Sequence, residues 1–112
     1  MSKLVLRVGG ANHEFVTLGE LAKMSGKTTD SMKKLIKRGL IPDSNLRTPP
    51  KKITYGERIG ELIEGDRIYS LNILVPVLVP LLKSITQGKR ITIEHKVKIY
   101  DAFEMERIKL NI

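Results

Sequence analysis

The sequence predicts one domain of the α+β class, and three of its features favour that class. An alternating apolar stretch near the N-terminus ends in a pair of glycines, as the first strand of a hairpin does. Two short amphipathic helices follow, and a second hairpin signal comes later around another glycine. The chain has 112 residues, of which 41% are hydrophobic and 29% are charged. One folded domain with its own core is expected for that length and composition.

The first expected element is an N-terminal β-hairpin. Leu4, Leu6 and Val8 alternate with residues that would point to the other face of a strand. The two glycines that follow mark a turn, and Phe15 and Val16 supply the apolar positions of the returning strand.

A short helix is expected over residues 18 to 24. Thr17 can accept a hydrogen bond from the backbone of Glu20 while the Glu20 carboxylate reaches back to Thr17, which is the reciprocal capping box. Ser25-Gly26 then ends the helix, because glycine adopts the left-handed conformation that closes a helix.

A second helix is expected from a cap at Thr28 or Thr29 through Arg38. Its apolar positions share one face, and basic residues occupy the other. The apolar positions are Met32, Leu35 and Ile36. Two short helices separated by a glycine turn, the second basic outside and apolar inside, are typical of a helix-turn-helix.

The segment after these helices predicts a loop followed by a hairpin. Residues 43 to 56 contain Pro49-Pro50 and little periodicity, which is typical of a loop. Residues 58 to 70 place apolar positions on both sides of Gly65, where glycine would supply the positive φ of a hairpin turn. Because a β-hairpin after a helix-turn-helix is a wing, we expect a winged helix-turn-helix with an N-terminal β-hairpin and a C-terminal helical extension.

The C-terminal part is expected to be mostly helical. Ser70 can cap the apolar run of residues 71 to 82, in which Pro76 and Pro80 predict a short helical turn, a kink and a second piece. Strand and helix patterns overlap after residue 90, and the length of the pattern favours a helix over about residues 92 to 109, capped by Thr92. The surplus apolar surface fits either an oligomer interface or the completion of the monomer core. The expected division is a hairpin (residues 1–16), a winged helix-turn-helix domain (residues 17–82) and a C-terminal helix that is a candidate oligomerisation element (residues 83–112).

The charge of the chain is strongly positive and unevenly distributed. Twenty Lys and Arg against 12 Asp and Glu give a net charge of +8 and a pI near 9.9, which favours polyanionic partners. Residues 27 to 58 hold nine basic and three acidic side chains, whereas residues 59 to 112 hold eight basic and seven acidic side chains. The excess therefore lies over the second helix and the loop after it. The alternative interpretation is a basic surface that is merely solvated.

We expect the second helix to bind duplex DNA in the major groove. Its N-terminal turn would reach base edges, and its later basic residues would lie near phosphates. The base-edge group is Lys27, Thr28, Thr29 and Ser31, and the basic outer face is Lys33, Lys34, Lys37 and Arg38. Further wing or backbone contacts are expected from Arg47, Lys51, Lys52, Arg58 and Arg67. A structural role is an equal alternative for Arg67, through pairing with an acidic neighbour, and for Tyr69, through packing under the wing.

Several short motifs follow one another in a fixed order along the chain. They are Glu20-Leu21-Ala22, Gly26, Gly39-Leu40-Ile41-Pro42, Arg47 and Gly65-x-Arg67-x-Tyr69. This ordered set, over roughly residues 17 to 80, resembles the winged-helix domain of MerR-like regulators and phage excisionases. The resemblance implies a DNA-binding scaffold in which the Gly-Leu-Ile-Pro segment ends the reading helix and the Gly-x-Arg-x-Tyr strand belongs to the wing. The chain departs from the family in its longer spacer between Pro42 and Gly65 and in having lysines where MerR activators have paired tyrosines. No effector domain follows, so no small-molecule effector is expected.

Catalytic, metal and membrane functions are not expected. The chain contains no Cys, which excludes thiol chemistry and Cys-ligated zinc and favours a reducing cytoplasm. His13-Glu14 lacks a second histidine at the zinc-protease spacing and His95 stands alone, so no catalytic residue, metal or cofactor is expected. The longest apolar run is shorter than the roughly 20 residues of a membrane span.

These features together predict an oligomeric protein that binds double-stranded DNA. A transcription regulator or an excisionase-like architectural factor of bacterial or phage type is the expected role, with sequence-specific or architectural binding. The alternative is a structural or adaptor protein, such as a virion or packaging component, that uses the helix-turn-helix scaffold mainly for protein contacts.

Overall fold

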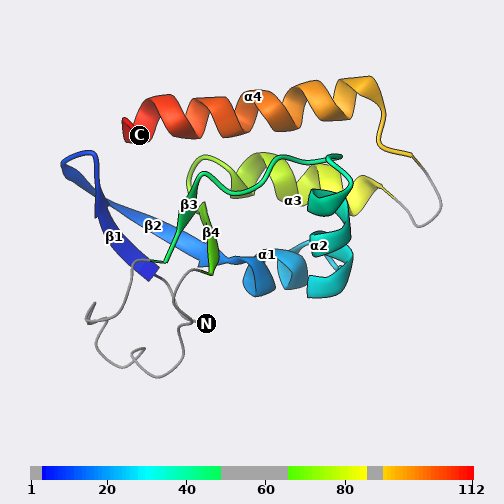
Figure 1. Ribbon diagram of the computed structural model, residues 1–112, viewed down its shortest axis with the longest axis horizontal. Helices are drawn as coiled ribbons and strands as arrows, with labels where there is room; N and C mark the ends of the chain where they lie inside the picture. The colour runs from blue at the N-terminus through cyan, green and yellow to red at the C-terminus, as the bar shows by residue number, and fades with distance from the viewer. Residues whose placement is uncertain (1–3, 49–65, 86–89) are drawn as a thin grey trace.

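The structure is a computed structural model that describes residues 4–48, 66–85 and 90–112 (Figure 1). These residues form a mixed α+β fold with a four-stranded antiparallel sheet and four helices, which confirms the predicted class. In chain order the elements are β1 (Leu4–Val8), β2 (Ala11–Thr17), α1 (Leu18–Met24), α2 (Thr29–Lys37), β3 (Leu46–Arg47), β4 (Arg67–Ser70), α3 (Val75–Ser84) and α4 (Ile93–Leu110).

The predicted N-terminal hairpin is present and belongs to a larger sheet. β1 and β2 pair in antiparallel register with Leu4 opposite Phe15, and the sheet order is β1-β2-β4-β3. The turn is made by Gly9 and Gly10, whose φ angles of 60° and 87° are left-handed, as a two-residue hairpin turn requires. On its other edge β2 pairs with β4, so that Phe15 also lies opposite Ser70. The hairpin therefore belongs to the same sheet as β4, which comes from the second half of the chain.

The two predicted short helices form where their caps place them. Thr17 Oγ1 accepts a hydrogen bond from the Glu20 backbone N–H at 3.3 Å, and Thr28 Oγ1 accepts one from Ser31 at 3.1 Å. Thr28 is thus the cap of α2, and Arg38 is the residue that follows the last helical turn. The inner faces of α1 and α2 pack with α3 and α4 in one hydrophobic core, which includes Leu21, Met32, Leu78, Leu82 and Phe103.

The apolar run after β4 differs from its prediction. Ser70 Oγ accepts a hydrogen bond from the Leu74 backbone N–H at 3.1 Å and so caps a turn, as expected. The run forms the expected turn, over residues 71–74, and α3 follows as the second piece; the chain does not break at Pro80, because α3 continues through that residue. Pro76 lies in its first turn, where no backbone donor is needed. Pro80 removes one internal hydrogen bond, and the complete burial of Leu78 and Leu82 on the opposite side compensates.

A second difference concerns residues 43 to 56, which were expected to form a loop. Leu46 and Arg47 instead form strand β3 and pair with Ile68 and Arg67 of β4. Two residues are too few to show an alternating pattern, so the strand is decided by its partner. The rest of the predicted loop after Thr48 and the turn around Gly65 lie outside the described residues.

Helix α4 closes the other side of the molecule. It begins after the predicted cap Thr92, whose Oγ1 accepts from His95 N at 3.1 Å, and it ends one residue beyond the predicted boundary. In Figure 1 it lies along α3 and reaches the tip of the β1–β2 hairpin. There Leu110 packs in a second small core with Leu4, Phe15 and Ile68. Among the described helices, none is both long and apolar enough to cross a membrane.

Candidate nucleic-acid interface

Helix α2 separates an apolar face from a basic one. Met32 is fully buried, and Leu35 and Ile36 pack against the same core. The opposite side carries four exposed cations: Lys33, Lys34, Lys37 and Arg38. Within the described part of the chain none of these four side chains takes part in an ion pair. The only acidic residue of the helix is Asp30, so α2 presents an unpaired cationic face to solvent.

The residues predicted to reach base edges are placed differently from the basic face. Thr28 is exposed but serves as the helix cap, while Thr29 and Ser31 are half-buried. Lys27 is also half-buried, and its Nζ donates a hydrogen bond to the Ile85 carbonyl oxygen at 3.4 Å. This turn therefore faces the C-terminal end of α3 as well as solvent.

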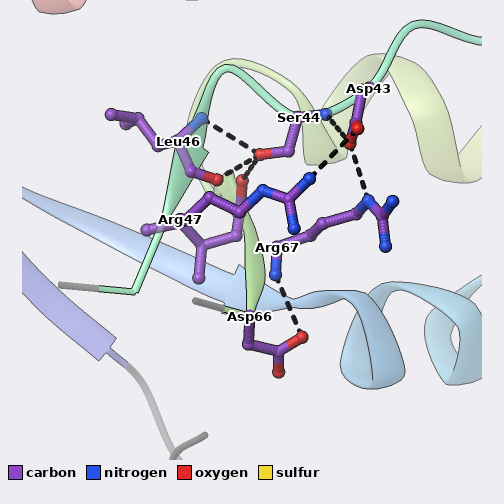
Figure 2. Close-up of polar contacts among 7 residues, drawn as sticks. Asp43, Ser44, Leu46, Arg47, Asp66 and Arg67 are labelled. Carbon is purple, nitrogen blue, oxygen red and sulfur yellow. Dashed lines mark hydrogen bonds and ion pairs between the residues drawn. The ribbon is translucent and has the colours of Figure 1, made fainter. Parts of the chain in front are cut away.

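Two of the expected wing arginines meet at one carboxylate, as Figure 2 shows. Arg67 Nε lies 2.6 Å from Asp43 Oδ1, and an Arg47 terminal nitrogen lies 3.1 Å from Asp43 Oδ2. The Ser44 backbone N–H also donates to Asp43 Oδ1, at 2.7 Å. Ser44 Oγ lies 2.6 Å from the Ile68 carbonyl oxygen and ties the same segment to β4. The cluster thus joins the segment after α2 to strands β3 and β4.

The charges of this cluster stabilise one another. Burial acts to raise the pKa of Asp43, but the hydrogen bonds from Arg67 and Ser44 outweigh it and hold that pKa below its usual value. The hydrogen bond to Asp43 raises the pKa of Arg67 against the opposing effect of burial. The acidic neighbour expected for Arg67 under its structural alternative is therefore Asp43. Arg47 is not the free loop residue that was expected, because it belongs to β3 and shares the same carboxylate.

The other predicted contacts of this region lie outside the described residues. They are Lys51, Lys52 and Arg58. Of the predicted phosphate contacts, the described ones are therefore the α2 face and the partly neutralised arginine pair.

A buried carboxylate that the sequence analysis missed fixes the position of this region. Glu106 of α4 is fully buried, and its two oxygens accept hydrogen bonds from the Ser70 backbone N–H at 2.9 Å and from Asn45 Nδ2 at 2.8 Å. Asn45 Nδ2 also donates to the Phe103 carbonyl oxygen at 3.0 Å. The sequence contains one indication of this role, because Glu106 lies on the same helical face as Ile99 and Phe103. A carboxylate on a buried face needs hydrogen-bond partners.

Tyr69 of β4 is buried in the main core, which agrees with a structural role for this residue. Its ring is fully buried and meets Phe103 edge-on, with ring centroids 6.3 Å apart. Its hydroxyl has no hydrogen-bond partner in the part of the chain that the structure describes, and burial raises the pKa of that hydroxyl. Tyr69 is thus a core residue that connects β4 to α4.

The histidines have separate positions. His95 Nδ1 accepts a hydrogen bond from the Thr92 backbone N–H at 3.2 Å and completes the α4 cap, while His13 lies on β2 opposite Leu6. Over residues 4–48, 66–85 and 90–112, no group of three His, Cys, Asp or Glu side chains is arranged to hold a metal ion.

No protein-family model, curated protein or solved structure matches the chain. The resemblance to MerR-like regulators and phage excisionases therefore stays a prediction.

Proposed function

We propose that this protein binds duplex DNA through the basic face of α2, in the manner of a winged helix-turn-helix. The observation that supports the proposal is the set of four exposed, unpaired cations on a helix whose other face is anchored in the core. A helix fits the major groove of B-DNA, and lysines and arginines on its outer side can reach phosphates. Asp43, Arg47 and Arg67 then hold the segment after α2 against the β3–β4 pair rather than contribute many phosphate contacts.

The salt dependence of DNA binding tests this proposal. Each phosphate contact contributes a slope of about −0.9 to a plot of log affinity against log salt, so four contacts from α2 would give about −3.6. The double variant Lys34→Ala with Lys37→Ala should reduce the slope by about 1.8 and weaken binding to mixed-sequence duplexes. Fluorescence anisotropy of a labelled duplex at several salt concentrations measures both quantities.

A matched control distinguishes the loss of charge on α2 from the same loss of charge elsewhere on the protein. Arg7→Ala with Arg90→Ala removes the same charge from two exposed positions that lie on neither α2 nor α4. This control should leave the slope almost unchanged. A wild-type slope near zero, or equal losses in the two double variants, would contradict the role of α2.

We also propose that the protein acts as an oligomer, through the outer side of α4. Ile93 and Ile108 are 80% and 63% exposed, and they lie near the two ends of the same outward stripe. A two-fold axis between two antiparallel copies of α4 would place Ile93 of one copy opposite Ile108 of the other. The same patch of each copy would then face the other, as a two-fold interface requires.

Native mass in solution tests this second part. Ile93→Glu with Ile108→Glu should convert the oligomer to a monomer without unfolding it, because both side chains are already exposed. Self-association would double the number of DNA contacts and raise affinity by avidity. A wild-type protein that is monomeric at micromolar concentration would contradict the interface.

Two roles remain candidates within this proposal. DNA binding favours a transcription regulator or an excisionase-like architectural factor of bacterial or phage type. The exposed stripe of α4 favours the alternative role of a structural or adaptor protein, such as a virion or packaging component. A gel shift on mixed duplex DNA at low salt separates them, since the adaptor would cause no retardation.

A further inference from the structure

A cavity opens between the start of α2 and the end of α3. Its volume is about 500 Å³, and its walls are the α1–α2 turn, the first turn of α2, and Leu82, Lys83 and Ile85 at the end of α3. In Figure 1 the C-terminal end of α3 lies beside α2 at the same end of the molecule. The hydrogen bond from Lys27 Nζ to the Ile85 carbonyl oxygen joins two residues of the cavity wall.

Ser25 is the residue that distinguishes this cavity from an ordinary surface groove. It lines the cavity and is only 3% exposed, yet its Oγ is buried and finds no hydrogen-bond partner among the described residues. A buried hydroxyl without a partner is destabilising and uncommon, which points to a ligand that supplies the missing acceptor. The Ser25 backbone N–H is already used, because it donates to the Leu21 carbonyl at the end of α1.

The other groups around the cavity favour an anion. Two cationic side chains, Lys27 and Lys83, line it, and Thr28 and Ser31 add hydroxyl groups. The nine-residue helix α2 begins at this wall, with the partial positive charge of its free backbone N–H groups. Lys27 already engages the Ile85 carbonyl oxygen, and the carboxylate of Asp30 is exposed and does not line the cavity.

We infer that this cavity binds a phosphate group, with Ser25 Oγ, Lys27 and Lys83 as its side-chain ligands. The inference rests on the proposed function only for the source of the phosphate, which is either the DNA backbone or a free phosphate compound. It gives the turn before α2 a role in holding a phosphate rather than in reading bases, and it adds α3 to the binding surface.

Titration with inorganic phosphate tests the site directly, with chloride added to hold the ionic strength constant. The amide resonances of residues 25 to 31 should shift saturably in the NMR spectrum of the wild-type protein. Ser25→Ala should weaken phosphate binding about tenfold, the loss expected for one hydrogen bond to a charged group. Its thermal midpoint should be equal to or above that of the wild type, because the hydroxyl removed has no partner. Ser84→Ala is the matched control, since it removes an exposed hydroxyl from α3 that does not line the cavity, and it should leave phosphate affinity unchanged.

Duplex binding by the same variants identifies the source of the phosphate. A tenfold weaker affinity of Ser25→Ala for DNA, with the salt slope unchanged because no charge is lost, assigns the cavity to a backbone phosphate. If Ser25→Ala binds phosphate more weakly but binds DNA as the wild type does, the cavity is assigned to a free phosphate compound. The same assignment holds if the wild type binds phosphate but no DNA. In that last outcome only the proposed function fails. Phosphate titration without saturable shifts, or equal phosphate affinity in Ser25→Ala and the wild type, overturns the inference.

Discussion

Removing the carboxylate of Glu106 should destabilise the whole arrangement of β4 and the segment after α2. In Glu106→Ala the Ser70 N–H and the Asn45 amide lose an acceptor in a fully buried position. An unsatisfied buried donor and the cavity left by a large-to-small change together predict a loss of about 3–6 kcal/mol in the free energy of unfolding. A domain of this size is stable by about 5–15 kcal/mol, so the variant is expected to be near the limit of folding.

Urea unfolding followed by far-ultraviolet circular dichroism measures this loss, with an unchanged slope as the check on two-state behaviour. Glu106→Gln should fall between the wild type and Glu106→Ala, because the amide oxygen can still accept from one of the two donors. Glu104→Ala is the control on the same helix, since that carboxylate is exposed and pairs only with Arg107. Equal unfolding midpoints for Glu104→Ala and Glu106→Ala would refute the reasoning.

Three further predictions concern the turn, the ion-pair cluster and the core. A Cβ at residue 9 would collide with the Leu110 carbonyl oxygen, whereas a Cβ at residue 10 would meet no atom within 4 Å. Gly9→Ala should therefore lower the unfolding midpoint well below that of Gly10→Ala. Equal midpoints would show that α4 does not close on this turn. The pKa of Asp43 lies below its ordinary 3.8, so its ion pairs contribute stability that is present above pH 3.8 and is lost as the pH falls through the lower folded-state value. The stability difference between the wild type and Asp43→Asn should therefore be seen at neutral pH and vanish in acid, and a difference that grows in acid would contradict this sign. Tyr69→Phe removes a buried hydroxyl without a partner and should raise stability by up to about 1 kcal/mol in urea unfolding, whereas a loss would indicate a hydrogen bond to that hydroxyl.

The elements that the sequence determined are those whose signals are local. The caps Thr17, Thr28 and Thr92 and the 3.6-residue apolar spacing placed α1, α2 and α4 within one or two residues of their observed ends. The glycine pair and the alternating residues before it located the first hairpin. The basic face of α2 could also be predicted from the sequence, because the apolar positions that anchor the opposite face lie within three turns of one helix.

Other features depended on residues that are distant in the chain. Strand β3 exists because Ile68 offers it a partner, and Pro80 stays inside α3 because tertiary packing outweighs one lost hydrogen bond. Glu106 meets Asn45 across 61 positions of sequence. The cavity beside Ser25 likewise requires the end of α3 to lie against the start of α2. No local pattern records such pairings, because their energy comes from burying groups together only after the chain has folded.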